Sequence, residues 1–352
     1  MKTLSWYNVR GAAERLTGHV HRTPVLESAS LNEIAGRHLY LKAEALQKTG
    51  SFKARGALNA VLSLPKDARG VVTHSAGNHG QALAWAAVKQ RGLKCAVVVP
   101  EGTAQVKVDA IRGYGAELQF CKPDVEARSN AMEAIARDRN WISIPPYNHD
   151  DVMAGQGSLA WEFCEQMEEM LEQGIINLKP GENPSGLSIL DAILVPVSGG
   201  GMAAGVAVAM SHLSPDTKIF LVAPEGKGLD ESLRHGSQSS SIPQGPLDTI
   251  CDGMRTRRLG DLCFPIVQRL AEPQVLEVND KDVAAAMRLT MERSKIVVEP
   301  SGASALAAAL KIERALGHKE SSKLKRLGLI MCGGNLDVSA GAESGHTLGP
   351  PP

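Results

Sequence analysis

The sequence has few aromatic residues and no net charge. Its 352 residues include five phenylalanines, four tryptophans and four tyrosines, and 38 basic side chains balance 38 acidic ones. A nucleic-acid-binding protein needs a surplus of lysine and arginine to contact phosphates, so this balance argues against that class. We therefore expect no nucleic-acid partner. The one short basic run, residues 323–326, is interpreted as a solvated face.

Long apolar runs and paired cysteines are also missing. No segment reaches the roughly 18 consecutive apolar residues of a transmembrane helix, and the first residues lack the apolar core of a signal peptide. We therefore expect no membrane partner. The six cysteines follow no C-x-x-C or zinc-like spacing and are interpreted as free thiols of a reducing compartment, which predicts a soluble cytoplasmic protein acting on a small molecule. These cysteines are Cys95, Cys121, Cys164, Cys251, Cys263 and Cys332.

Short apolar runs alternate with longer segments of helical pattern. The runs are continuous rather than alternating, which is typical of strands covered on both faces. This order predicts the α/β class, with open, twisted, mostly parallel sheets flanked by helices. Strands are expected at 71–74, 95–100, 116–120, 192–197, 219–222 and 327–331, and helices at 81–90, 106–112, 125–139 and 158–173. Polar connectors are expected at 173–188 and 236–245, and a disordered tail at 341–352.

Three glycines follow the strand expected at 192–197. Gly199, Gly200 and Gly201 would let backbone N–H groups approach an anion at the start of the next helix, so we predict a phosphate site. A tight structural turn is the simpler alternative. A loose dinucleotide fingerprint, with Glu225 holding a ribose, is another, because a short glycine pattern alone does not identify the phosphate.

Lys53 lies in a second loop, where Thr49 and Ser51 are expected to cap a helix. A lysine in the first turn of a helix is disfavoured as a cation, which lowers its pKa and suits Schiff-base chemistry. An ordinary surface lysine is the alternative.

A third loop, residues 73–81, joins a strand to a helix. Asn78 could bond a hydroxylated ring, and Ser75 could hold a carboxylate. His79 could act in catalysis, although a lone histidine at a helix start is more often structural. At a fourth strand end, Cys332 could be inert packing or a ligand contact.

Five motifs occur in order along the chain: Ser51–Gly56, Ser75–Gly80, Gly199–Met202, Glu299–Ala303 and Cys332–Asn335. Together they resemble the fold-type II pyridoxal-phosphate enzymes, in the serine racemase and serine/threonine dehydratase branch. The resemblance extends from about Thr23 to Asn335. It is more specific than the dinucleotide pattern, which leaves Lys53 and Asn78 unexplained.

The resemblance implies a role for each motif. Lys53 would form the internal aldimine with pyridoxal 5′-phosphate and later move the substrate α-proton. Asn78 would bond the ring hydroxyl and Cys332 would face the ring nitrogen. The full set of implied cofactor contacts is Phe52, Lys53, Asn78, Ser198, Gly199, Gly200, Gly201, Met202 and Cys332. The implied substrate contacts are Ser75, Ala76, Gly77, His79 and Asn148.

The activity implied is β-elimination of L-serine, L-threonine or a related β-hydroxy amino acid to a 2-oxo acid and ammonia. A thiol facing the ring nitrogen is a poor proton donor, which suits expulsion of a hydroxyl group. Racemases of this branch carry a second serine where this chain has Ala76, and racemisation needs a proton donor on each face. Serine racemase activity therefore stays as the alternative, and a catalytically decayed scaffold as a lesser one.

The family's divalent cation is in doubt here. Ala223 replaces the first expected carboxylate, and Leu229 takes the downstream acidic position. Glu225 and Asp230 are out of register, and Lys227 could substitute a positive charge. We expect no metal site of this kind.

The resemblance also implies an architecture. Residues 1–63 and 147–340 would form a large cofactor-binding domain, and residues 64–146 a small mobile domain that closes over the substrate. Relatives of this branch are usually homodimers, so a homodimer is expected.

Overall fold

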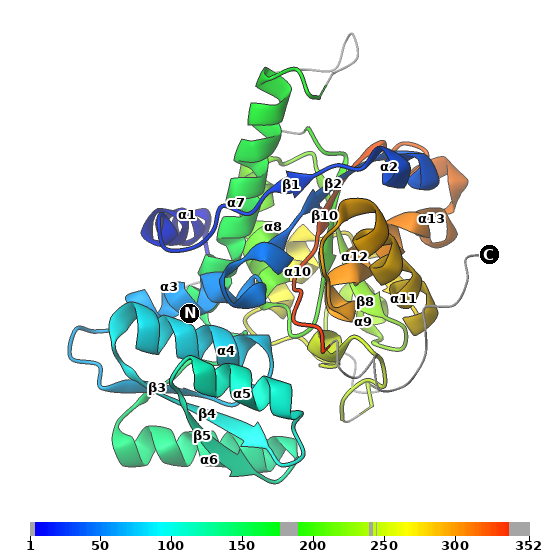
Figure 1. The fold of residues 1–352 in the computed structure, drawn as a ribbon. Helices are drawn as coiled ribbons and strands as arrows, with labels where there is room; N and C mark the ends of the chain where they lie inside the picture. The colour runs from blue at the N-terminus through cyan, green and yellow to red at the C-terminus, as the bar shows by residue number, and fades with distance from the viewer. Residues whose placement is uncertain (1–3, 177–188, 239–241, 244, 338–352) are drawn as a thin grey trace.

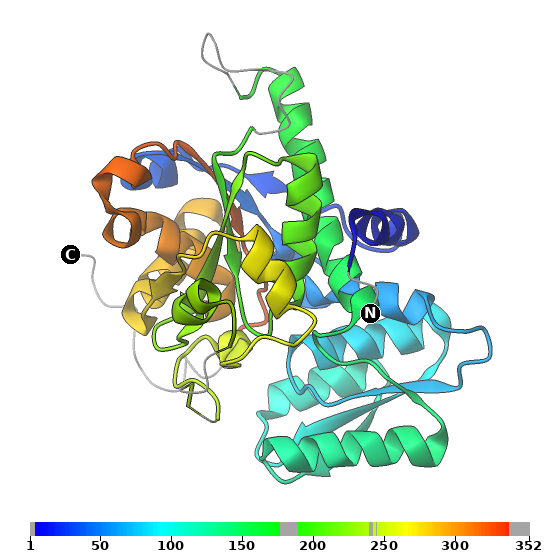
Figure 2. The ribbon, with the colours of Figure 1, turned by 180° about the vertical axis from the view of Figure 1, so that it is seen from behind.

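A computed structural model describes residues 4–176, 189–238, 242–243 and 245–337. The described residues form two mostly parallel sheets, each covered by helices on both faces (Figures 1 and 2). The expected α/β class with two open, mostly parallel sheets is therefore confirmed.

The larger sheet has six strands in the order β1-β2-β10-β7-β8-β9. β1 is antiparallel to β2, and every other neighbouring pair is parallel. Because β2, β10 and β7 are neighbours and run in the same direction, the loops that follow them leave the sheet at the same edge. The strands are β1 (Val25–Leu26), β2 (His38–Lys42), β7 (Ala192–Pro196), β8 (Lys218–Pro224), β9 (Leu276–Val278) and β10 (Arg326–Ile330).

Alternate residues of these strands pack into two different cores. Ile193 and Val195 face α7 and α8, whereas Leu194 faces α2 and α12, as the two-residue period of a strand requires. Figure 2 shows α8 in front of the sheet, on the side opposite α12 of Figure 1. The helices of this unit are α1 (Trp6–Leu16), α2 (Ala29–Ala35), α7 (Asp150–Glu172), α8 (Gly201–Leu213), α9 (Leu229–His235), α10 (Phe264–Leu270), α11 (Asp280–Leu289), α12 (Pro300–Leu310) and α13 (Ile312–Ser321).

The smaller sheet has four parallel strands in the order β5-β4-β3-β6. Val71 and Val97 face one core with α3 and α4, while Val72 and Val98 face α6. Figure 1 shows this unit below the larger sheet. Its strands are β3 (Gly70–Thr73), β4 (Lys94–Pro100), β5 (Glu117–Cys121) and β6 (Ile142–Ser143), and its helices are α4 (Asn78–Ala84), α5 (Gln105–Gly113) and α6 (Val125–Arg139). The helix α3 (Lys53–Leu62) packs against both this unit and α7 of the larger one.

The six predicted strands are confirmed to within about two residues, but four others were missed. β1 and β6 have only two residues each. β2 contains His38 and Lys42, and the buried Lys42 amine pairs with Glu162 and donates to Thr23 O and Gln166. The expected connectors and tail fall partly or wholly outside the described residues.

The long helix α7 begins eight residues before the predicted start at Ser158. Gly155 and Gly157 weaken the helical signal of this segment. The structure shows why glycine is there: a Cβ on Gly155 would lie 2.6 Å from the Arg55 carbonyl oxygen, and one on Gly157 would lie 2.7 Å from the Gly205 carbonyl oxygen. The same glycines therefore bring α7 close to α3 and α8.

Candidate active site

The loop that carries Lys53 is fixed to the loop that follows β10. Phe52 N donates to Cys332 O at 3.1 Å, and Gly334 N donates to Gly50 O at 2.9 Å. Ser51 also forms an isolated antiparallel bridge with Gly333. These backbone contacts place Lys53 at the carboxyl edge of the larger sheet, beside the cysteine that the sequence analysis singled out.

Lys53 is the first residue of α3. Its Nζ donates to Pro146 O at 2.7 Å and lies 5.1 Å from the centre of the Phe52 ring. Burial lowers the pKa of Lys53 to about 8. A lowered pKa is what Schiff-base chemistry needs, as the sequence analysis predicted. Its largest cause is burial, however, and not the predicted helix dipole.

The predicted capping of α3 by Thr49 and Ser51 is wrong. The cap residue is Phe52, with no side-chain cap, because Ser51 is still extended and pairs with Gly333. The hydroxyl oxygens of Thr49 and Ser51 are buried without a hydrogen-bond partner among the described residues. Such orphaned groups near a buried amine are typical of a site built for a ligand.

Asn78 is held by two residues from distant parts of the chain. Its Nδ2 donates to the Glu299 carboxylate oxygens at 2.8 and 3.1 Å, and its Oδ1 accepts from Asn335 Nδ2 at 2.8 Å. Asn335 Nδ2 also donates to Thr49 O at 2.8 Å. The network joins the smaller unit to the larger one and fixes the orientation of the Asn78 amide.

Glu299 is a site residue whose role sequence reasoning missed. Its motif was among the five that carry the resemblance, but nothing in its local pattern indicated that its side chain would reach Asn78. The side chain is almost fully buried, and burial raises the pKa of Glu299 to about 7 despite the hydrogen bond from Asn78. The signal that could have found it is a lone acidic residue directly before the Pro300 helix start in a buried segment.

Cys332 is buried beside the start of α12. Its Sγ donates to Ser301 O at 3.4 Å. Burial, with the nearby Glu299 carboxylate adding to it, raises the pKa of the Cys332 thiol well above its ordinary value. The group is therefore a neutral thiol, which fits a weak partner for a ring nitrogen.

The glycine loop lies between β7 and α8. Gly200 has a φ of +92°, which favours glycine, and a Cβ there would lie 2.7 Å from Leu259. A Cβ on Gly199 would lie 2.5 Å from the ring of Tyr147, so packing alone already requires glycine here. The first N–H groups of α8 have no partner within the helix, and the start of a helix favours a bound anion. The predicted phosphate site requires this arrangement. Met202 is buried in the first turn of α8.

The loop after β3 brings the expected substrate contacts to the same edge. Ser75 and Ala76 precede Gly77, which caps α4. A Cβ on Gly80 would lie 1.9 Å from Ser75 O, so this glycine holds the turn closed. The roles of Ser75, Ala76 and Gly77 toward a substrate stay predictions.

His79 and Asn148 are held by protein groups. The His79 ring is 1% exposed, its Nε2 lies 3.0 Å from Ile144 O, and its Nδ1 is buried without a partner among the described residues. Burial, with the Lys53 charge adding to it, lowers the pKa of His79 to about 3, so the ring is neutral. Asn148 turns toward the loop that precedes α10, where its Oδ1 accepts from Leu262 N at 2.7 Å. Substrate contacts by these two side chains stay predictions.

The two positions where the resemblance places carboxylates carry apolar side chains in this chain. Ala223 and Leu229 are buried among hydrophobic neighbours, Glu225 is exposed, and Asp230 pairs with Arg234 at 2.6 Å. Within the described ranges no group of three or more histidine, cysteine or acidic residues is placed to bind a metal ion. Ala223 and Leu229 therefore do not fit the carboxylate cation site that the resemblance implies.

The site fits pyridoxal phosphate through four kinds of group. Lys53 supplies an amine, the start of α8 supplies free N–H groups suited to an anion, Asn78 offers a fixed amide, and Cys332 offers a neutral thiol. In that order, these groups match the aldehyde, the phosphate, the ring hydroxyl and the ring nitrogen of the cofactor. The Ser51 hydroxyl, two residues before Lys53, is buried without a partner among the described residues.

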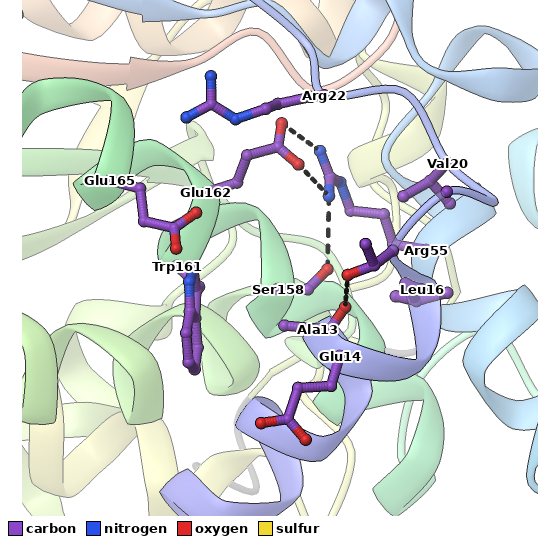
Figure 3. Close-up of a pocket in the computed structure, with 12 residues that line it drawn as sticks. Ala13, Glu14, Leu16, Val20, Arg22, Arg55, Ser158, Trp161, Glu162 and Glu165 are labelled. Carbon is purple, nitrogen blue, oxygen red and sulfur yellow. Dashed lines mark hydrogen bonds and ion pairs between the residues drawn. The ribbon is translucent and has the colours of Figure 1, made fainter. Parts of the chain in front are cut away.

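A buried ionic cluster fixes the helix that carries Lys53. Arg55 donates through Nε and Nη2 to Glu44, and through Nη1 and Nη2 to Glu162, at 2.7 to 3.0 Å. Lys42 joins it by pairing with Glu162 at 2.6 Å. Figure 3 shows Arg55 and Glu162 facing each other beside a cavity of about 390 Å³, with Ser158 also bonded to Arg55. The cluster joins α3 to α7 and to the 3₁₀ turn after β2.

Known proteins resemble this chain over nearly its whole length. It is 41% identical over 345 residues to a serine racemase of Dictyostelium discoideum, a match that covers 97% of each chain. It is 37% identical over 350 residues to the L-threo-3-hydroxyaspartate ammonia-lyase of Saccharomyces cerevisiae, covering 97% of this chain and 98% of the relative. Among solved structures, maize serine racemase matches with a TM-score of 0.86 at 33% identity, covering 97% of each chain. A threonine deaminase of T.th. matches with a TM-score of 0.82 at 36% identity, covering 95% of this chain and 99% of that one.

Residues 16–333 match the model of a family described as pyridoxal-phosphate dependent enzyme. This span contains all five motifs except the last two residues of the fifth, Gly334 and Asn335. The dinucleotide alternative is thereby set aside. The chain belongs to the family of pyridoxal-phosphate-dependent enzymes, in its fold-type II branch.

Proposed function

We propose that the protein eliminates water from a β-hydroxy amino acid and releases a 2-oxo acid and ammonia. The observation that carries the proposal is the position of Lys53, a buried amine of lowered pKa at the edge where the glycine loop, Asn78 and Cys332 converge. A catalytically decayed scaffold is disfavoured because each of these chemical groups is present and held by neighbours.

Each residue has a distinct task in this proposal. Bound pyridoxal phosphate supplies an electron sink that labilises the α-proton of an attached amino acid. Lys53 holds the cofactor covalently at rest and takes the α-proton through Nζ. Asn78, fixed by Glu299 and Asn335, orients the ring. The neutral Cys332 thiol keeps its proton, so the ring nitrogen stays unprotonated and loss of a β-hydroxyl group is favoured over a long-lived carbanion.

Ala76 favours elimination over racemisation. Racemisation needs a proton donor on the face of the substrate opposite Lys53, and a methyl group cannot supply a proton. Serine racemase activity is nevertheless a second candidate, because relatives of that name are 41% and 38% identical to the chain. The two activities differ only in what happens after the α-proton has left.

The substitution Ala76→Ser is expected to create or raise racemase activity. A hydroxyl at this position can return a proton to the second face, so D-serine formation from L-serine should rise about tenfold or more over the parent enzyme. Chiral chromatography of the recovered serine measures it. Ala76→Val is the control for added bulk, because it enlarges the side chain without a hydroxyl. Equal D-serine from the Ser and Val variants would contradict the reason given for elimination.

A substrate panel tests the proposed reaction. Purified enzyme with pyridoxal phosphate is incubated with L-serine, L-threonine and threo-3-hydroxyaspartate, and both ammonia and 2-oxo acid are measured. Equal amounts of the two products from at least one substrate are expected. Absence of 2-oxo acid from every β-hydroxy amino acid tested would refute the proposal.

Attachment of the cofactor should depend on pH through Lys53. Only the neutral amine attacks the aldehyde, and the pKa of Lys53 is about 8 instead of the ordinary 10.5. The rate of attachment to cofactor-free protein is therefore expected to rise about tenfold per pH unit below 7 and to level off above about 8. Stopped-flow absorbance from pH 6 to 10 measures it, with Nα-acetyl-lysine as the reference amine. A rate that still climbs steeply between pH 9 and 10 would show that Lys53 has an ordinary pKa.

We further propose the domain division, the assembly and the location. Residues 64–146 would form a mobile unit that closes over the substrate and excludes water, since they contain the smaller sheet and the Ser75–Gly77 loop. A cytoplasmic location is supported by six free cysteines. No helix in the described part of the chain has the length and apolar character needed to cross a membrane. A homodimer rests on the family likeness, and Tyr7, which is 78% exposed on α1, is a candidate contact.

A further inference from the structure

Lys227 is a fully buried lysine in the turn between β8 and α9. Its side chain is 0% exposed, and its Nζ donates to Ser198 O at 3.1 Å and to Thr256 O. Within the described ranges no salt bridge joins it to a carboxylate. A buried charge is normally paired, because an isolated one is costly to remove from water.

A second cation lies next to Lys227. Arg257 donates from Nη1 to Gly226 O at 2.9 Å, and its Nε is buried without a partner among the described residues. Burial lowers the pKa of Lys227 to about 7, and the charge on Arg257 adds to the effect. Backbone carbonyl groups do not neutralise two neighbouring cations. The remaining positive potential would stabilise an anion close to them.

The contacts of Lys227 lead directly to the glycine loop. The oxygen of a trans peptide unit points away from its N–H, so holding Ser198 O toward Lys227 turns the N–H of Gly199 to the opposite side. Gly199 O accepts from Gly260 N at 3.0 Å, which orients the N–H of Gly200 in the same way. Thr256 and Gly260 belong to one segment, so Lys227 ties that segment to the glycine loop.

We propose that Lys227 is a positioning residue for the phosphate group of the cofactor: its side-chain amine orients the peptide between Ser198 and Gly199, and a bound phosphate favours the protonated form of this amine in a site without metal-binding carboxylates. This inference rests on the placement of the phosphate at the glycine loop, which is part of the proposed function. It goes beyond that placement by identifying Lys227 as the side chain that orients the glycine loop.

The test compares two ligands that differ only in the phosphate. The dissociation constants of pyridoxal phosphate and of pyridoxal, which lacks the phosphate, are measured by quenching of tryptophan fluorescence. The proteins are the parent chain, Lys227→Met, which removes the charge, and Lys227→Gln, which keeps a donor for the carbonyl groups. Lys218→Met is the matched control, because Lys218 is exposed on β8. Circular dichroism verifies that each variant is folded.

A phosphate-specific effect is expected. Both Lys227 variants should bind pyridoxal phosphate about tenfold or more weakly, with little change for pyridoxal, since only the phosphate interacts with the charge. Methylammonium chloride should partly restore the affinity of Lys227→Met, and Lys218→Met should bind like the parent.

Three results would overturn the inference. The first is that Lys227→Gln binds pyridoxal phosphate as tightly as the parent does, a result that counts even if Lys227→Met does not fold. Both ligands could weaken equally, which would show a purely structural role. Methylammonium could also fail to improve binding to a folded Lys227→Met. If the parent chain itself binds no pyridoxal phosphate, the proposed function fails instead.

Discussion

Replacing Lys53 with alanine should abolish turnover. The variant loses both the covalent link to the cofactor and the group that takes the α-proton, so we expect kcat to fall by about 10³-fold or more. Production of 2-oxo acid measures the loss. The visible absorbance band that borohydride bleaches in the parent holoenzyme should also disappear, because the amine 2.7 Å from Pro146 O that would carry the cofactor is removed.

The control for this variant is Lys66→Ala, which removes an exposed lysine just beyond α3. It should retain parental turnover and the visible band. Full activity in Lys53→Ala, or a bleached band that maps by mass spectrometry to another lysine, would show that the resting cofactor is attached elsewhere.

The substitution Arg55→Met should strongly destabilise the fold. It leaves the Glu44 carboxylate, which is 0% exposed, without its cationic partner. Burial acts to raise the pKa of Glu44, yet the Arg55 guanidinium overcomes this and holds that pKa below its ordinary value. Breaking a buried pair by removing one partner costs about 3–5 kcal/mol, so the free energy of unfolding in urea should fall by that amount.

Arg22→Met provides the comparison, because Arg22 also pairs with a glutamate but both side chains are about half exposed. Such a surface pair contributes about 0–1 kcal/mol. A loss of less than about 1 kcal/mol in Arg55→Met would mean that Glu44 is solvated or protonated after the change, and that the cluster does not fix α3. The motif Ser51–Gly56 thus contains both Lys53, which is proposed to act in the chemistry, and Arg55, which fixes α3 in place.

The sequence supports the fold class because buried parallel strands have a strong local signal. The runs at 95–100 and 192–197 are apolar without interruption, and both became central or near-central strands. β2 lacked that signal because it contains Lys42, whose partner in the ionic cluster, Glu162, lies more than a hundred positions away in the sequence. The early start of α7 was hidden by glycines whose purpose is contact with other helices.

In the candidate site, too, local patterns could be predicted from the sequence, whereas contacts between distant residues could not. Lys53, Asn78, Cys332 and the glycine loop could be proposed because each follows a strand or opens a helix, where ligands bind in open α/β sheets. The contacts of Glu299 with Asn78 and of Tyr147 with Gly199 could not, since they depend on which distant loops meet. The orientation of Asn148 toward Leu262 was likewise invisible in the sequence.

The fate of the α-proton tests the proposed chemistry most directly. Parent holoenzyme is incubated with L-serine in D₂O, and proton NMR and chiral chromatography follow pyruvate, ammonium and α-deuterated D-serine together. Because Ala76 gives the second face no proton donor, pyruvate and ammonium should form in equal amounts and in clear excess over D-serine. D-serine carrying α-deuterium in excess over pyruvate would contradict elimination as the main reaction and identify the enzyme as a racemase.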